Sequence, residues 1–265
     1  MQKHRAVLAC VVSILVTATV CNAQSPAADE RGLWQVWAAS TNAVDERAIV
    51  TACSEFRGKS PKDPLVVVAA GLEAWHLLKM GNTNAAVALF EPMAALPENA
   101  TYLQTAAADM ARGWLTRLDR ETVRNALKKI YARDIEFPSS LSALSSLKNS
   151  PMFPSTDRWG KPWVYRLESP LKGMSAQQFV LESVRLGSRS DLVKALALPY
   201  AGQINMEPVR MSPVSADTVE FTTLAGKTAF LQAGGTLSGI SVAYLGSNLI
   251  VMADENHWRV VMKPR

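Results

Sequence analysis

The chain has 265 residues, of which 48% are hydrophobic and 19% are charged, and its formal net charge is +5. This composition provides enough apolar side chains for a buried core and excludes a wholly disordered protein. The length predicts two or three modest domains. Because the basic residues are scattered and form no basic face, we expect no nucleic-acid partner.

The first 23 residues have the pattern of a secretory signal peptide. Lys3 and Arg5 form a basic start, residues 6–20 are apolar, and the next three residues, Cys-Asn-Ala, place small side chains where signal peptidase cleaves. Cleavage before Gln24 would lower the net charge to +3, and we expect an exported, periplasmic protein associated with the envelope. Two alternatives stay open: an uncleaved membrane anchor and a lipoprotein attached at Cys21.

The cysteine content bears on disulfide bonding. Removal of residues 1–23 would leave Cys53 as the one cysteine of the mature chain. A disulfide framework within that chain is therefore not possible, and we expect Cys53 to be a small buried side chain.

Residues 31–118 are predicted to be helical. Between residues 63 and 97, apolar side chains recur every three or four positions, and a Gly-Asn-Thr-Asn turn interrupts them, which predicts a helical hairpin. The segment Leu77–Gly81, together with Ala86 and Phe90, resembles one tetratricopeptide repeat. A single repeat cannot bury its own apolar face, so we expect the hairpin to pack on its neighbours; a peptide-binding groove is the alternative.

Two further helices are expected before the sequence changes character. One begins at Thr101 and ends near Leu118, and Asp119 can cap the next helix by accepting from free amides of its first turn. The second helix has an apolar face formed by Val123, Leu127, Ile130 and Tyr131. Pro138 forbids helix continuation through the residue before it, and residues 141–147 are predicted to form a short helix.

The most informative stretch is Asp157-Arg158-Trp159-Gly160-Lys161-Pro162-Trp163-Val164-Tyr165. Gly160 permits the backbone conformation of a tight turn, and Pro162 restricts the step after it. Trp163 and Tyr165 then point to one face of an extended strand. We predict that the two tryptophans and the tyrosine fix this strand onto the preceding helix, at ~1.5–3 kcal/mol for each large buried side chain. The alternative is a generic aromatic hairpin in an unrelated α+β domain.

In their order along the chain, these features resemble the C-terminal domain of the major pseudopilin of type II secretion. The resemblance covers residues 119–192 and implies a pseudopilin-like domain over residues 119–200, in which a helix packs on a small antiparallel sheet. The positions that match the family are Tyr131, Pro138, Asp157, Trp159, Gly160, Pro162, Trp163, Tyr165, Leu186 and Gly187.

Two features of the pseudopilin family are missing. Pseudopilins polymerise through an apolar N-terminal helix that follows a prepilin-peptidase site, whereas here the similar part follows a long helical region. The family's calcium loop is reduced to Ser188-Arg189-Ser190-Asp191, in which Asp191 is the single candidate ligand. Since calcium takes six to eight oxygen ligands, we expect no calcium and no other cofactor.

The remaining sequence is predicted to be a linker and a β module. Prolines mark residues 201–214 as a linker, and residues 215–265 alternate apolar and polar side chains as strands do. The segments Phe230–Leu237 and Asn248–Val251 resemble the small periplasmic β domain of the type II secretion clamp protein and of the pilus lipoprotein that docks to secretin. The resemblance implies a surface for other envelope proteins; any small half-barrel is the alternative.

Motifs for catalysis are not found in the sequence. His76 and His257 are the only histidines after residue 23, and no HExxH helix, Cys/His ligand set or GxSxG turn accompanies them. Asp157 and Asp191 can face one another, but no pattern marks one as an acid and the other as a base. We expect neither an enzyme nor a small-molecule substrate.

Together, the patterns predict an α+β protein with N-terminal helical hairpins, a pseudopilin-like helix packed on a small antiparallel sheet, and a C-terminal all-β module. The expected function is that of a non-catalytic component or accessory of a type II secretion or type IV pilus-like envelope machine. Its partners would be other secretion or pilus-assembly proteins. The alternative is a periplasmic helical-repeat scaffold or peptide-binding protein that reuses a pseudopilin-like fold.

Overall fold

The structure is a computed structural model, and it describes residues 28–42, 45–145, 153–168, 177–198 and 204–265. The predicted signal peptide and its cleavage site lie outside these ranges. Among the helices within them, none combines the length and the apolarity that crossing a membrane requires.

Six helices open the described chain and strands predominate after them, with η1 and α7 between β2 and β3, which confirms the predicted α+β class. The helices are α1 (Glu30–Asn42), α2 (Glu46–Lys59), α3 (Val66–Lys79), α4 (Thr83–Ala94), α5 (Tyr102–Asp134), α6 (Ser142–Ser145), the 3₁₀ turn η1 (Ser188–Ser190) and α7 (Leu192–Ala197). The strands are β1 (Val164–Glu168), β2 (Gln178–Glu182), β3 (Met206–Met211), β4 (Val219–Thr223), β5 (Thr228–Leu231), β6 (Thr236–Leu237), β7 (Ile240–Leu245), β8 (Leu249–Ala253) and β9 (Trp258–Met262).

Helix α5 is continuous over 33 residues, so the predicted break before Asp119 is wrong. The predicted start is confirmed: Thr101 and Gln104 form a capping box in which each side chain accepts from the other residue's backbone N–H. Asp119 lies inside the helix, and its carboxylate accepts from the Arg158 guanidinium, at 3.1 Å from Nη2. No Gly or Pro follows Gly113 within α5, so nothing in the local sequence ends the helix earlier.

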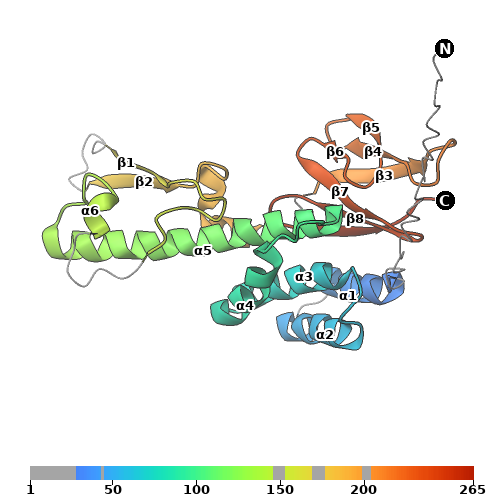
Figure 1. Ribbon diagram of the computed structural model, residues 1–265, viewed down its shortest axis with the longest axis horizontal. Coiled ribbons are helices and arrows are strands. Elements are labelled where there is room, and N and C mark those ends of the chain that lie inside the picture. The colour runs from blue at the N-terminus through green and yellow to red at the C-terminus, as the bar shows by residue number, and fades with distance from the viewer. Residues whose placement is uncertain (1–27, 43–44, 146–152, 169–176, 199–203) are drawn as a thin grey trace, which may run out of the picture.

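The long helix joins two lobes, one at each end (Figure 1). We call base lobe the assembly of α1–α4, the first half of α5, α7 and β3–β9. The head lobe consists of the second half of α5 with α6, β1 and β2. The helical region and the β module, which are far apart in the sequence, therefore lie together in one lobe, and the pseudopilin-like segment lies apart from them.

The base lobe has three layers: helices, a four-stranded sheet of order β6-β7-β8-β9, and a three-stranded sheet of order β3-β4-β5. Strand β8 is buried on both faces, as its unbroken apolar sequence Leu-Ile-Val-Met-Ala favours. Leu249 and Val251 pack with the helices, whereas Ile250 and Met252 pack with the three-stranded sheet. The middle sheet thus connects two cores.

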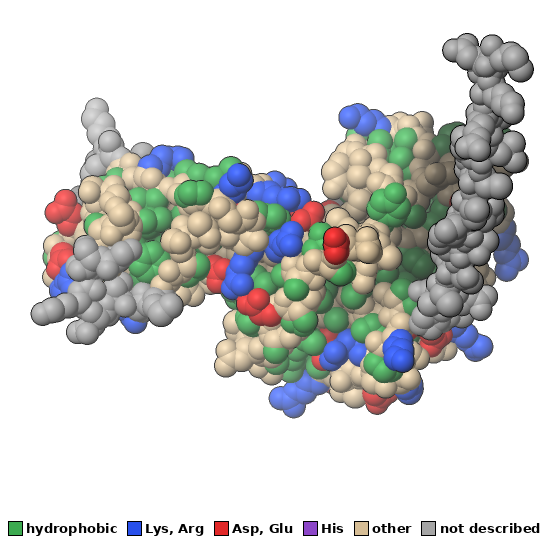
Figure 2. All heavy atoms as spheres, in the orientation of Figure 1, with side chains coloured by type: hydrophobic (Ala, Val, Ile, Leu, Met, Phe, Trp, Pro, Cys, Tyr) green, Lys and Arg blue, Asp and Glu red, His purple; other side chains and the backbone are tan. Residues whose placement is uncertain are grey.

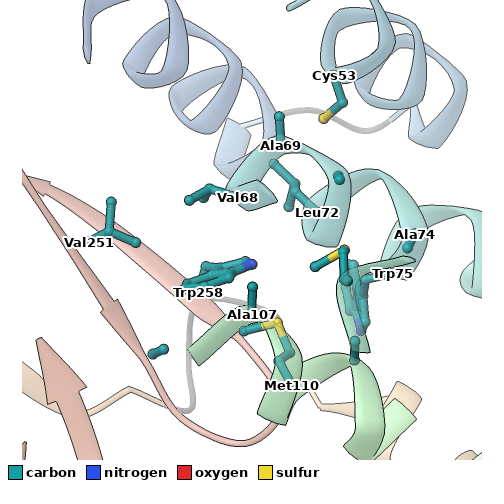
Figure 3. Close-up of a cluster of buried hydrophobic side chains, with 14 of the residues drawn as sticks. Cys53, Val68, Ala69, Leu72, Ala74, Trp75, Ala107, Met110, Val251 and Trp258 are labelled. Carbon is teal, nitrogen blue, oxygen red and sulfur yellow. The ribbon is translucent and has the colours of Figure 1, made fainter. Parts of the chain in front are cut away.

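Trp258 lies where the helices meet the middle sheet, between Val251, Leu72 and Met110 (Figure 3). Its indole packs closely on Gly71 of α3, where an added Cβ atom would come 2.5 Å from the indole nitrogen. Gly71 is therefore needed for the close approach of β9 to α3.

Helix α3 is buried along almost its whole length, since every residue from Val68 to Leu78 is covered. This confirms that the α3–α4 hairpin packs on its neighbours. Cys53 of α2 is buried in the same core, as expected, and burial raises the pKa of its thiol to about 12.

The first helix is tied to the β7–β8 turn by one carboxylate. Glu30 accepts from the Tyr244 hydroxyl at 2.9 Å, from the Ser247 backbone N–H at 2.7 Å, and from the Asn248 backbone and side-chain amides at 2.7 and 3.1 Å. Gly246 adjoins this carboxylate and has no room for a side chain. This carboxylate thereby joins the start of α1 to the β7–β8 turn.

The predicted linker over residues 201–214 is wrong in part, because Met206–Met211 form strand β3. β3 is an edge strand, and its pairing with β4 shifts register between Pro208 and Arg210. An edge strand tolerates Pro because one of its backbone edges needs no sheet partner. The strands predicted after residue 215 are all present, as are the turns that contain Gly226, Gly234, Gly246 and Glu255.

In the head lobe, β1 and β2 pair antiparallel and pack on α5. The register sets Val164 opposite Glu182 and Tyr165 opposite Leu181. The core is small, and its buried members are Val123, Leu127, Phe137, Leu144, Trp163 and Leu181.

Candidate functional site

The Asp157 turn holds the most informative sequence motif together. The carboxylate of Asp157 is buried and accepts from the backbone N–H groups of Trp159 and Lys161, at 3.0 and 2.9 Å. Its other oxygen accepts from the Ser183 hydroxyl at 2.7 Å. Gly160 has a φ of +74°, which fits the tight turn predicted there. One aspartate thus closes the turn and anchors it to the end of β2.

The network continues beyond Ser183 into the Leu-Gly segment. The Ser183 hydroxyl accepts weakly from the backbone N–H of Leu186 at 3.4 Å, and the Ser183 N–H donates to the Ser190 hydroxyl at 3.0 Å. Ser190 in turn donates to the Gly187 carbonyl at 2.7 Å. Asp157, Leu186 and Gly187, which the sequence analysis grouped through a family resemblance, are therefore brought together by hydrogen bonds.

The aromatic residues of the motif follow the predicted strand geometry. Trp163 is buried and donates from its indole to the Pro154 carbonyl at 2.8 Å, and Tyr165 donates from its hydroxyl to the Pro138 carbonyl at 2.7 Å. Tyr131 stacks on Phe137 with ring centroids 4.5 Å apart. Burial raises the pKa of Tyr165. These residues hold the hairpin on the helix, as expected.

Trp159 does not join this core, contrary to prediction. Its indole nitrogen donates to Asp109 at 3.3 Å, and the Arg185 guanidinium lies 4.7 Å from its ring centroid. Asp109 belongs to the first half of α5, more than five turns from Tyr131. Trp159 therefore lies at the junction of the lobes, because the turn that carries it points along α5 towards the base.

Arg158 also crosses the junction. Its guanidinium donates to Asp119 of α5 and to Glu91 of α4, the latter at 2.9 Å. Its backbone N–H donates to the Thr116 hydroxyl at 3.2 Å. The Asp-x-Trp-Gly turn thus contacts the base lobe through the side chains of Arg158 and Trp159.

A buried arginine at this junction was missed by the sequence analysis. Arg117 is fully buried in α5, donates from Nε to the Arg189 carbonyl at 2.9 Å, and donates from Nη2 to the Asn256 side-chain oxygen. Asn256 also accepts, through its carbonyl, from the Trp114 indole at 2.8 Å. Burial lowers the pKa of Arg117 to about 10. A signal existed in the sequence, since Arg117 follows Met110 and Trp114 at the spacing of one helix face.

The β8–β9 turn approaches α5 closely at the same place. At Gly113 an added Cβ atom would come 2.9 Å from the Glu255 carbonyl oxygen. Asp254 accepts from the backbone N–H groups of Asn256 and His257, at 2.6 and 2.7 Å. Burial raises the pKa of Asp254 to about 6, and the Glu255 charge adds to this rise.

Asp191, the candidate calcium ligand, caps a helix. Its carboxylate accepts from the Lys194 backbone N–H at 3.0 Å and lies 3.6 Å from the Arg120 guanidinium. Burial opposes the shift, but these two contacts lower the pKa of Asp191. Within the described ranges, no group of three or more His, Cys, Asp or Glu side chains is arranged to hold a metal ion. No hydrogen bond or ion pair links Asp191 to Asp157 in that part of the chain.

The two histidines of the described residues, His76 and His257, lie in the base core. His76 contacts Glu46 through Nδ1, and burial lowers its pKa. His257 lies edge-on to the rings of Trp75 and Trp114, with centroids 6.2 and 6.0 Å away, and burial lowers its pKa to about 3. At neutral pH the His257 ring is therefore uncharged and is part of the packing.

Comparison of the chain with protein-family models, with curated proteins and with solved structures finds no match. The geometry itself offers hydrogen-bonded turns, aromatic packing and a charged junction between two lobes.

Proposed function

We propose that the protein is a non-catalytic, exported component or accessory of a type II secretion or type IV pilus-like envelope machine. It acts through protein–protein contacts. The head lobe serves as a pseudopilin-like platform, and the base lobe, which unites the helices with the β module, carries that platform and contacts further partners.

The observation that carries this proposal is the Asp157 turn. Asp157 accepts from the Trp159 and Lys161 backbone and from Ser183, and Ser183 and Ser190 extend these bonds to Leu186 and Gly187, so four of the positions matched to the pseudopilin pattern lie in one hydrogen-bond network. The hairpin that follows packs on a long helix through Trp163 and Tyr165. The order of the motifs along the sequence and the packing of the hairpin on α5 therefore both support the proposal.

A native co-purification tests the proposal. The full chain carrying an affinity tag is expressed in its own cells, cross-linked before detergent extraction, and its partners are identified by mass spectrometry. We expect enrichment of a secretin, an assembly ATPase or pilin-like subunits over an unrelated exported protein with the same tag. Recovery of none of these from native membranes contradicts the proposal.

The Asp157→Ala variant shows whether the head lobe makes the contact. Its matched control is Asp217→Ala, which removes a carboxylate at an exposed position of the base lobe, away from the junction. Loss of the partners with the first variant and their retention with the second supports the head lobe as the platform. Equal recovery with both assigns the contact to the base lobe.

A further inference from the structure

The three-stranded sheet of the base lobe has two edges, β3 and β5, because β4 lies between them. β5 lies at the outer limit of the base lobe (Figure 1). Among the described residues, no further strand pairs with the outer side of either edge. An edge strand presents unpaired backbone N–H and C=O groups to which another chain can bind, and natural proteins usually protect such edges.

The β3 edge carries protective features that are typical of natural edge strands. Pro208 lacks a backbone N–H, and the pairing with β4 shifts register between Pro208 and Arg210. The strand also carries the charged side chains of Glu207 and Arg210, both of which are exposed. These features disfavour the addition of another strand at β3.

The β5 edge differs from β3 in each of these features. Its sequence is Thr-Ala-Phe-Leu, without proline or charge, its register with β4 is regular, and Lys227 lies before the strand. The Phe230 side chain is 49% exposed, and the Arg210 guanidinium lies over its ring, 5.7 Å from the centroid. Figure 2 shows mostly uncharged side chains over this end of the base lobe, with basic side chains at its margin. β5 is therefore the open edge of the sheet.

The backbone groups of Thr228 and Phe230 point to the open side of β5. In an antiparallel pair, residues whose N–H and C=O groups bond to the neighbouring strand alternate with residues whose groups point away from it. The Thr223 N–H donates to the Lys227 carbonyl at 2.9 Å, so Lys227 is a bonded position. Ala229 lies two residues further and is bonded as well, which leaves Thr228 and Phe230 pointing outward. In the described part of the chain, no loop or further strand bonds to the backbone of these two residues.

The length of the edge selects the kind of partner. β5 has four residues, whereas a stable complex of two folded proteins uses ~20–30 residues on each side. A second copy of this chain that paired through β5 alone would therefore bury too little surface for a stable dimer. A short extended segment needs only backbone partners at alternate residues and contacts for its side chains, and the edge of a sheet supplies both.

We propose that β5 binds an extended, uncharged segment of a partner protein, which adds to the three-stranded sheet as a further strand. The backbone groups of Thr228 and Phe230 pair with the segment. An aromatic or β-branched side chain of the segment lies against the Phe230 ring, as in favourable cross-strand pairs. The inference rests on the proposed protein–protein function and assigns one of its contacts to a named edge.

The test uses the full chain and a displayed library of random short peptides. Selected peptides are synthesised, and their affinity is measured by fluorescence anisotropy. Each peptide is also made with methyl groups on alternate backbone nitrogens, in either of the two phases. One phase should weaken binding at least about tenfold and the other less than about twofold, because only alternate N–H groups of an added strand face β5. Equal effects of the two phases contradict strand addition.

Matched variants assign the binding to β5. Phe230→Lys places a charge on the open edge, and Val209→Lys makes a similar change on β3, where the side chain is 53% exposed. Thr228→Pro removes an N–H that points to the open side, at the first residue of a strand, where proline is tolerated. Phe230→Lys and Thr228→Pro should each weaken binding at least about tenfold, and Val209→Lys less than about twofold. Thermal unfolding checks that each variant is folded.

Selection of no peptide, or equal binding to Phe230→Lys and Val209→Lys, overturns the proposal. A concentration-dependent dimer in analytical ultracentrifugation that Phe230→Lys abolishes also overturns it, in favour of pairing between two copies of β5. Peptide binding at β5 while native co-purification recovers no envelope component contradicts the proposed function alone. Envelope partners retained by Phe230→Lys, with no selected peptide, contradict the β5 assignment alone.

Discussion

The base and head lobes share α5 but are assembled from the chain in different ways. In the base, Glu30 binds residues more than two hundred positions away, at the β7–β8 turn. In the head, the bond from the Phe137 N–H to the Gln177 side chain spans 40 positions, and the paired strands follow one another. The base therefore requires nearly the whole described chain, whereas the head is a local excursion between its two parts.

The two cores also differ in what stabilises them. The base core is large and joins Trp258, Trp114 and Phe90 to many aliphatic side chains. The head core is small and depends on a few rings and on the buried Asp157. We therefore expect apolar truncation to affect the base most and loss of polar contacts to affect the head most.

The largest effect is expected for Trp258→Ala in the base. The side chain is fully buried between the helices and the middle sheet, so its loss leaves a cavity costing ~3–5 kcal/mol of unfolding free energy. Urea unfolding measures the loss, and hydrogen exchange should show faster exchange in the base than in the head. Trp34→Ala, at a half-buried position in α1, should cost less. Equal acceleration in both lobes would show that they unfold as one unit.

Asp157→Ala should have the largest effect in the head. It leaves two backbone N–H groups and the Ser183 hydroxyl without their shared acceptor, at a cost of about 3 kcal/mol. Hydrogen exchange of β1 and β2 measures the effect. Asp217→Ala, at an exposed position of the base lobe, should cost less than ~0.5 kcal/mol. The contrast between the lobes fails if the base loses as much protection as the head.

The stability of the base lobe should depend on pH through two buried groups, Asp254 and His257. Asp254 has a folded pKa of about 6 against an ordinary 3.8, so its contribution to stability is present below pH 3.8 and is lost as pH rises through 6. His257 has a folded pKa of about 3 against an ordinary 6.5, so its contribution is present above pH 6.5 and is lost as pH falls. Between pH 4 and 6 the two contributions oppose each other.

Asp254→Asn removes the pH-dependent contribution of Asp254 and leaves that of His257. The amide oxygen can still accept from the Asn256 and His257 N–H groups, so we expect the fold to persist. Stability should then fall more steeply between pH 6 and 4 than in the unmodified protein, by on the order of 1–2 kcal/mol in urea unfolding. Parallel pH profiles for the two proteins would refute the assignment.

The smallest effect is expected for Gly160→Ala in the head. Its φ of +74° disfavours a side chain, although no neighbouring atom would clash with the new methyl group. The expected loss is about 1 kcal/mol by thermal unfolding. Gly58→Ala, in the exposed part of α2, is the control with opposite sign and should stabilise by ~0.5–1 kcal/mol. A stabilising Gly160→Ala would show that the turn does not need this conformation.

Local sequence patterns predicted the individual elements well where the cause was local. The helix start at Thr101, the turn at Gly160 and the alternating strands after residue 215 are properties of short segments, and each was found. The break at Asp119 failed because a residue that can cap a helix is also tolerated inside one, where its carboxylate contacts Arg158. The linker failed because Pro208 is tolerated on an edge strand, a position that no local pattern reveals.

By itself, the sequence determined the α+β class, the helical hairpin and the Asp157 motif, because periodicity and turn chemistry act over a few residues. Only the tertiary structure decided that α5 is a single helix, that the helices and the β module share a core around Trp258, and that Arg117 links the segment after β2 to the β8–β9 turn. These features depend on which faces meet across long stretches of chain, and burial of apolar area in three dimensions selects those faces.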